Sequence, residues 1–242
     1  MPHPVMAALQ ANPASGFNPE NDITWHSLFW AEGTGFKARG YSDGGTVSTW
    51  DNETGETDAT SGNTKVTYDE VDTNLNNQPS VAFNGTNGAL ETAAFSVNPT
   101  YSISIVAIIS LVDTAANRTI CDNYASPNHR LFFRGSDDKI AWKIGTTTTA
   151  STFVAGAGAH GVVATADGST GNETITVAGT TYLNTNVGDD TISGLSIGKD
   201  TGSAHVYNGT IALIGIYEGD VTADGSWSDF QTWASDHYGV TI

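Results

Sequence analysis

The chain is poor in cysteine, in basic residues and in long apolar runs, and each shortage excludes a class of protein. Its 242 residues contain one cysteine, so no disulfide can form within the chain and no cysteine framework indicates an oxidising compartment. Nine lysines and arginines stand against 26 aspartates and glutamates, for a net charge of −17. Nucleic-acid binding depends on neutralising phosphates, so this balance argues against a nucleic-acid partner and against docking on an anionic membrane.

The apolar runs are too short for membrane insertion. The best of them, residues 103–112, contains Ser104 and Ser110 and cannot span a bilayer. The first residues lack the basic and apolar regions of a signal peptide, so the sequence predicts a protein made in the cytoplasm with no signalled exit. Assembly into a particle that leaves the cell by lysis is one route that needs no signal.

Aromatic residues and turn signals are plentiful. Six Trp, eight Tyr and nine Phe can support a packed core in a chain of this length. From residue 24 onward, short stretches of β-forming residues alternate with turn signals such as Asn84-Gly85 and Asp167-Gly168. Apolar side chains alternate along one predicted strand and should share its buried face: Ile103, Ile105, Ala107 and Ile109. This rhythm predicts an all-β sandwich or jelly roll.

The two ends of the chain depart from this rhythm. Residues 1–24 hold four of the seven prolines, which argues against a regular helix or central strand and predicts an extended arm. The arm is either a disordered terminus or a strap that docks on another subunit. Near residue 242, Ser226 as N-cap, Asp229 three residues later and Gly239 as stop signal predict one helix over about 226–238.

Residues 130–144 are typical of a β-hairpin closed by a four-residue polar turn. Antiparallel pairing gives one apolar face, which should be core: Leu131, Phe133, Ile140, Trp142 and Ile144. The other face carries three cross-strand pairs: Arg134 with Lys139, Phe132 with Ala141, and Arg130 with Lys143. Four of the nine basic residues therefore gather around one aromatic ring, although like charges directly opposite each other destabilise a sheet.

The basic face of this hairpin is the main candidate binding site, and three interpretations stay open. Its members are Arg130, Phe132, Arg134, Lys139 and Lys143. They could stack on and hydrogen-bond an acidic glycan, or bind an acidic loop of a neighbouring subunit. Alternatively, acidic residues beside the hairpin in the same fold neutralise it, which the overall acidity of the chain favours.

Candidate catalytic and metal sites are weaker. Retaining glycoside hydrolysis needs two carboxyl groups ~5 Å apart. The only comparable run is residues 70–75, with Glu70 and Asp72 as the candidate pair; it lacks a final acid and lies in a polar region expected to be a loop. Calcium needs several oxygen ligands, and three short acidic stretches are candidates without a defined ligand set: Asp137-Asp138, Asp189-Asp190 and Asp122-Asn123. The sequence therefore predicts no enzyme and no required cofactor, with calcium as an option.

A family resemblance becomes visible in the order of several motifs. They are LFWA at 28–31, DGGTVSTWD at 43–51, ETG at 53–55, QPSVAFNG at 78–85, AHGVVA at 159–164, LSIG at 195–198 and YNGTIALIGIY at 207–217. Together they resemble a LamG-like, concanavalin A-like lectin/glucanase domain covering roughly residues 28–242. The resemblance implies an all-β jelly roll of two antiparallel sheets, with domain boundaries at 1–24 for the arm and 25–242 for the jelly roll.

The resemblance also implies a range of functions. Members of this family bind glycans or proteins, often through rim loops with calcium, and some hydrolyse polysaccharides. Versions without a signal peptide are similar to accessory proteins of tailed-phage virions, which is an analogy of fold and context. We therefore expect a non-enzymatic virion protein on a phage tail or capsid, forming a homo-oligomer and attached to other virion proteins by its arm. Its jelly roll would contact a cell-surface glycan; the alternatives are a structural cement protein and a polysaccharide hydrolase.

Overall fold

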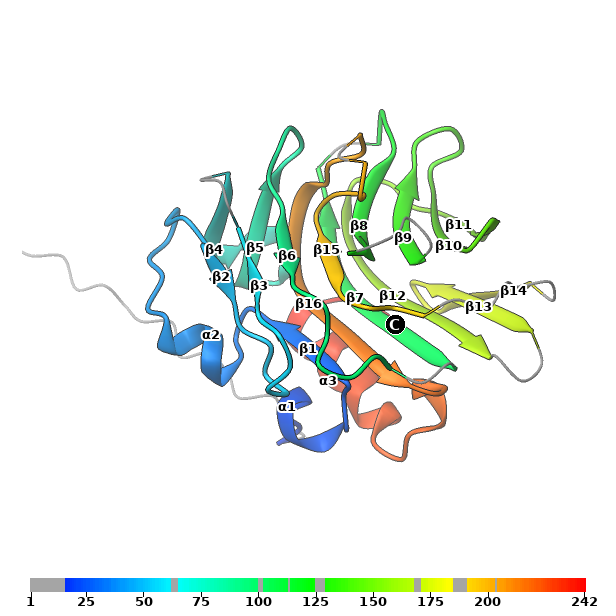
Figure 1. The fold of residues 1–242 in the computed structure, drawn as a ribbon, viewed down its shortest axis with the longest axis horizontal. Helices are drawn as coiled ribbons and strands as arrows, with labels where there is room; N and C mark the ends of the chain where they lie inside the picture. The colour runs from blue at the N-terminus through cyan, green and yellow to red at the C-terminus, as the bar shows by residue number, and fades with distance from the viewer. Residues whose placement is uncertain are drawn as a thin grey trace, which may run out of the picture.

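The computed structural model describes residues 16–61, 65–99, 102–112, 114–124, 129–167, 171–184, 191–202 and 204–242. Two eight-stranded antiparallel sheets, here named sheet A and sheet B, form a sandwich (Figure 1). The strands of sheet A are β1 (Ser27–Trp30), β4 (Val66–Asp72), β5 (Gln78–Asn84), β7 (Ile103–Leu111), β12 (Gly158–Asp167), β13 (Asn172–Val177), β14 (Thr180–Asn184) and β16 (Asn208–Glu218). The all-β prediction is confirmed.

Sheet B is built from shorter strands and carries the predicted hairpin. Its members are β2 (Thr49–Trp50), β3 (Ala59–Thr60), β6 (Leu90–Thr92), β8 (Arg118–Asn123), β9 (His129–Arg134), β10 (Lys139–Ile144), β11 (Thr147–Val154) and β15 (Leu195–Ile197). Their order across the sheet is β11-β10-β9-β8-β15-β6-β3-β2, whereas sheet A runs β14-β13-β12-β7-β16-β5-β4, with β1 added beside β16. Neighbouring strands are thus often distant in sequence.

Strand β7 lies at the centre of the molecule, with all nine of its residues buried. Its alternating residues Ile103, Ile105, Ala107 and Ile109 face the core between the sheets, as predicted. Val106 and Ile108 point the other way into a second apolar cluster. Since both faces of β7 are covered, the strand reads as a nearly continuous apolar run.

Helix α3 (Trp227–Tyr238) forms this second cluster on the outer face of sheet A and runs behind β1 and β16 in Figure 1. The predicted helix and its Gly239 stop are confirmed, since Gly239 has φ 70°. The predicted capping box is wrong: the Ser226 side chain makes no cap hydrogen bond, and Asp224 instead accepts a bond from the Ser226 N–H at 2.8 Å. Among the described helices, none is long and apolar enough to cross a membrane.

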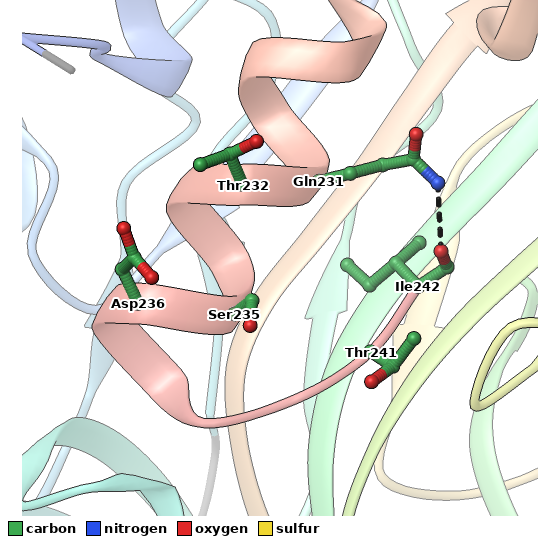
Figure 2. Close-up of a pocket in the computed structure, with 6 residues that line it drawn as sticks. All are labelled: Gln231, Thr232, Ser235, Asp236, Thr241 and Ile242. Carbon is green, nitrogen blue, oxygen red and sulfur yellow. Dashed lines mark hydrogen bonds between the residues drawn. The ribbon is translucent and has the colours of Figure 1, made fainter.

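The residues after α3 return along it. The Gln231 amide donates a hydrogen bond to the Ile242 carbonyl at 2.8 Å, which closes one side of a shallow cavity of about 370 Å³ (Figure 2). The Ile242 side chain lies over Gly161 of β12, where a β-carbon would come within 2.3 Å of it. Replacing Gly161 with a larger residue would therefore displace this segment from the sheet.

The exclusion of a helix from residues 1–24 is wrong for the last part of that segment. Helix α1 (Pro19–Asp22) begins with proline at its first position, where no N–H is needed, and Asn18 caps it by accepting the Glu20 N–H at 2.9 Å. Phe17 packs on Phe230 and Trp233 of α3, with ring centroids 5.9 Å apart in both pairs. Residues 16–24 therefore lie against the sandwich, and residues 1–15 of the predicted arm fall outside the described residues.

Candidate ligand-binding surface

The hairpin of β9 and β10 has the predicted register. Arg134 pairs with Lys139, Phe132 with Ala141 and Arg130 with Lys143. The five apolar residues of the opposite face lie in the inter-sheet core: Leu131, Phe133, Ile140, Trp142 and Ile144. The basic face is thus on the outer surface of sheet B, away from α3.

Acidic residues form ion pairs with three of the four basic residues on this face of the hairpin. Arg130 Nη1 lies 3.2 Å from Asp200 Oδ2, and Arg134 binds Asp137 through two hydrogen bonds, one of them Nε to Oδ1 at 2.7 Å. Lys139 Nζ is 3.6 Å from the same Asp137 carboxylate. Lys143 makes no ion pair within the described part of the chain. This geometry favours neutralisation by neighbouring acids and leaves Lys143 as the cation most open to an external partner.

Phe132 is covered rather than presented. Its side chain is 4% exposed, and the Arg130 guanidinium lies over the ring, 4.4 Å from its centroid. A sugar could stack on this ring only if Arg130 moved aside. The proposed stacking role of Phe132 therefore stays a prediction that requires such a movement.

A line of polar residues continues from the hairpin across sheet B. From β8 towards the far edge of the sheet, on the same outer face, successive strand pairs place Asp122 beside Ser196, Ser196 beside Glu91, Glu91 beside Thr60 and Thr60 beside Thr49. Directly paired residues of antiparallel strands share a face, and neighbouring strands are about 4.8 Å apart. We call this surface, from Lys143 and Arg130 to Thr49, the polar row.

Three consecutive residues after β15 bind the middle of the polar row. Lys199 Nζ lies 3.0 Å from Glu91, Asp200 pairs with Arg130, and the Thr201 N–H donates to Asp122 at 3.3 Å. His205 Nδ1 is 2.6 Å from Asp200 Oδ2 and joins the same cluster. Because the partners come from a distant loop, no local sequence pattern could reveal them.

Burial and hydrogen bonds shift the pKa values of the two carboxyl groups in this cluster in opposite directions. Asp122 is fully buried, which raises its pKa to about 6 against the opposing effects of hydrogen bonds from Thr201 and Asn123 and of the nearby Arg130 charge. Burial alone would also raise the pKa of Asp200, but hydrogen bonds from His205 and Ala204 hold it below its ordinary value. Asp200 is thus the permanent anion that neutralises Arg130.

Polar atoms beneath the loop lack partners among the described residues. They are Ser196 Oγ, Thr119 Oγ1 and Arg130 Nε, all of them buried. Leaving such groups unpaired is unfavourable, and because they are buried they are closed to a ligand that binds at the surface. No sequence pattern indicates these unpaired groups, because Ser and Thr are ordinary residues of exposed strands.

The candidate calcium stretches do not form a cluster. The described residues contain no group of three or more His, Cys, Asp or Glu side chains that could hold a metal ion. Asp137 is bound to Arg134, and Asp122 accepts backbone N–H groups. Asp189 and Asp190 lie outside the described residues.

The expectation of a loop around Glu70 and Asp72 is wrong, because both residues lie on strand β4. Asp72 is 2% exposed, and its carboxylate accepts hydrogen bonds from Ser80, Thr210 and the Asn74 N–H. Glu70 is exposed. The buried carboxylate stabilises the turn after β4, an arrangement that disfavours a catalytic pair.

Comparison with solved structures finds this fold in proteins of very different sequence. Trypanosoma rangeli sialidase superposes with a TM-score of 0.56 at 15% identity, over 87% of this chain and 32% of that one. The same sialidase in complex with sialic acid gives the same values. The shared fold is a jelly-roll sandwich of two antiparallel sheets. This chain spans about a third of the sialidase, and at such identity the likeness concerns the fold alone.

A heptameric SAP-like pentraxin from Limulus polyphemus is a more distant match, with a TM-score of 0.47 at 15% identity over 59% of this chain and 77% of that one. No model of a known protein family matches the sequence, and no curated protein matches it either. The jelly-roll architecture of two antiparallel sheets is thus shown by the structure, whereas the predicted link to tailed-phage virions stays a prediction.

Proposed function

We propose that this chain is a non-enzymatic, lectin-like module that binds an acidic cell-surface glycan through the polar row of sheet B. The observation that carries the proposal is the position of that row. Helix α3 covers much of the outer face of sheet A, whereas the outer face of sheet B presents Lys143 and the partly exposed side chains of Arg130 and Lys139. Polar side chains on a rigid sheet are well suited to sugar hydroxyl and carboxylate groups.

Exchange of Lys143 for glutamate tests the proposal. At low salt, we expect Lys143→Glu to weaken binding of acidic oligosaccharides, such as sialyllactose or hyaluronate fragments, at least about tenfold, since a charge-assisted contact becomes a repulsion. Lys65→Glu makes the same change in net charge just before β4 of sheet A and should alter affinity less than about twofold. Calorimetric titration measures both. Absence of binding to any acidic glycan, or equal losses in the two variants, would contradict the proposal.

We further propose that the module belongs to a phage virion and assembles as a homo-oligomer through residues 1–15. The fold of the described chain supports the choice of truncation, because Phe17 and α1 pack against α3 and must be kept. Weak sites repeated on one particle would then act together by effective concentration.

Removal of residues 1–15 is expected to convert an oligomer into a folded monomer. Light scattering gives the mass of both forms, and the tryptophan fluorescence of the Trp25 and Trp233 environment reports that the sandwich is intact. If both forms have the same mass per particle, the segment is not an assembly device, and a monomeric glycan-binding module remains.

A further inference from the structure

A cavity on sheet A is the second place where the molecule could hold a ligand. Its lining differs in chemistry from the polar row. Helix α3 leaves one corner of the outer face of sheet A uncovered. There, a cavity of about 320 Å³ is formed over β12, β13 and β14, beside the turn that follows β16. This volume is at the lower end of the range for small-molecule sites.

Hydroxyl groups and one apolar side chain form the floor of this cavity. Register pairs place Thr165 beside Thr174 and Thr174 beside Leu183, so all three share the outer face of the sheet. Leu183 is 52% exposed, an unusual position for a large apolar residue that is otherwise surrounded by polar groups. A threonine floor with an apolar edge can bond sugar hydroxyls while contacting the C–H face of the ring.

The walls are held in place by hydrogen bonds. Ser104 Oγ lies 2.9 Å from Thr165 Oγ1 and donates to the Gly219 carbonyl at 2.7 Å, which ties the turn after β16 to the floor. Gly219 has φ 97°, a conformation that favours glycine, so the turn keeps this path. Asp220 accepts the N–H and the hydroxyl of Thr222 on Oδ1, at 2.9 and 2.7 Å, and this orients its carboxylate.

The charge of the lining selects the ligand. Among the described residues, the cavity lining includes Asp167, Asn172 and Asp220 but no lysine or arginine. Two carboxylates without a cation beside them repel anionic ligands at this cavity. Carboxylate and amide groups are strong hydrogen-bonding partners for neighbouring hydroxyls.

We propose that this cavity is a binding subsite for a neutral hexose unit, separate from the acidic-glycan surface on sheet B. Thr165, Thr174 and Asn172 bond its hydroxyls, Asp220 accepts two further hydroxyl bonds, and Leu183 contacts its C–H face. The subsite does not depend on the polar row, because the residues come from different sheets.

Saturation-transfer NMR with the full chain tests the subsite, using methyl glycosides of glucose, galactose and mannose at millimolar concentration. We expect protein-dependent transfer to at least one of them and a dissociation constant about fivefold higher in Thr174→Val, the loss expected for one hydrogen bond. Thr176→Val is the matched control: Thr176 lies two residues along on the same face, and its hydroxyl pairs with Thr181 at 2.8 Å instead of lining the cavity. Leu183→Ala should also weaken binding. Because the Leu183 side chain is exposed, this change should leave the fold intact.

Three results would overturn the proposal: no transfer to any of the three glycosides, equal weakening by Thr174→Val and Thr176→Val, or tighter binding of glucosamine or glucuronate than of the neutral sugars. Lys143→Glu separates the two sites. It should leave neutral glycoside binding unchanged even where it abolishes acidic glycan binding, and a loss of both would show that only one site exists.

Discussion

Glu173→Gln is expected to remove most of a decline in stability that we expect of the native protein between pH 5 and pH 8. Glu173 lies on β13 with its side chain fully buried between the sheets. One carboxyl oxygen accepts the Thr149 hydroxyl at 2.6 Å, while the other has no partner among the described residues. Burial raises the pKa of this group from 4.5 to about 7, partly offset by the Thr149 bond.

The direction of the effect follows from proton binding. Between pH 4.5 and 7 the folded state holds the Glu173 proton more tightly than the unfolded state, so the free energy of unfolding falls as pH rises. The stabilisation is fully present below the unfolded pKa and is lost as pH passes through the folded one. A difference of this size corresponds to roughly 3 kcal/mol. Buried Asp122, with its pKa near 6, adds a smaller loss of the same sign.

Urea unfolding at several pH values measures this effect. Glutamine cannot ionise, but it leaves an extra buried donor, so Glu173→Gln should be about 1 kcal/mol less stable than the native protein at pH 5 and about 2 kcal/mol more stable at pH 8. Glu70→Gln, at an exposed position of β4, is the control and should follow the native curve. Parallel curves for native protein and Glu173→Gln would show that the buried group titrates normally.

Glu32→Ala is expected to lower the free energy of unfolding by about 3 to 5 kcal/mol, the usual cost of removing one partner from a buried polar cluster. Glu32 follows β1 and is buried under the end of α3. Its Oε1 lies 2.6 Å from His237 Nε2 and accepts the Tyr238 hydroxyl at 3.0 Å, and that hydroxyl in turn accepts the Trp30 indole N–H at 2.9 Å. Alanine leaves the His237 and Tyr238 groups buried without their acceptor.

Lys37→Ala provides the matched control for this prediction. Lys37 is at the exposed end of the same cluster, 3.8 Å from Glu32 Oε2, with 58% of its side chain exposed. Its loss should cost less than about 1 kcal/mol, because solvent screens such a pair. Denaturation followed by tryptophan fluorescence distinguishes the two variants. Similar small losses in both would mean that α3 is held by its aromatic packing alone.

Local patterns predicted the parts of this fold that depend on neighbouring residues. The alternation in residues 130–144 was sufficient for the register of β9 and β10, because a turn fixes which residues face each other. Ser226 and Gly239 likewise marked α3. By contrast, the proline-rich residues before 25 hid α1, since Asn18-Pro19 is a favourable helix start that proline content alone does not reveal.

The candidate sites depended on contacts that no local pattern contains. Asp200 reaches Arg130 from a loop 70 residues away in sequence, and Glu32 meets His237 across 205 residues. The sequence indicated that acidic residues should neutralise the basic face of the hairpin. Which acidic residues do so depends on the order of strands in sheet B. The cavity on sheet A was missed for the same reason, since Thr165, Thr174 and Asp220 are unremarkable until two strands and a turn bring them together.

The pairing of β1 with β16 has a consequence for folding during synthesis on the ribosome. Ser27 pairs with Ile216, and β7 gains its second neighbour only from the same late strand. While the chain is being synthesised, the earliest strand and one edge of the central strand must therefore wait with unpaired backbone groups until almost all of the sequence has emerged. Folding dominated by such distant pairings takes about milliseconds to seconds. During this time the exposed strand edges can pair with other chains, so we expect chaperones to bind the nascent chain.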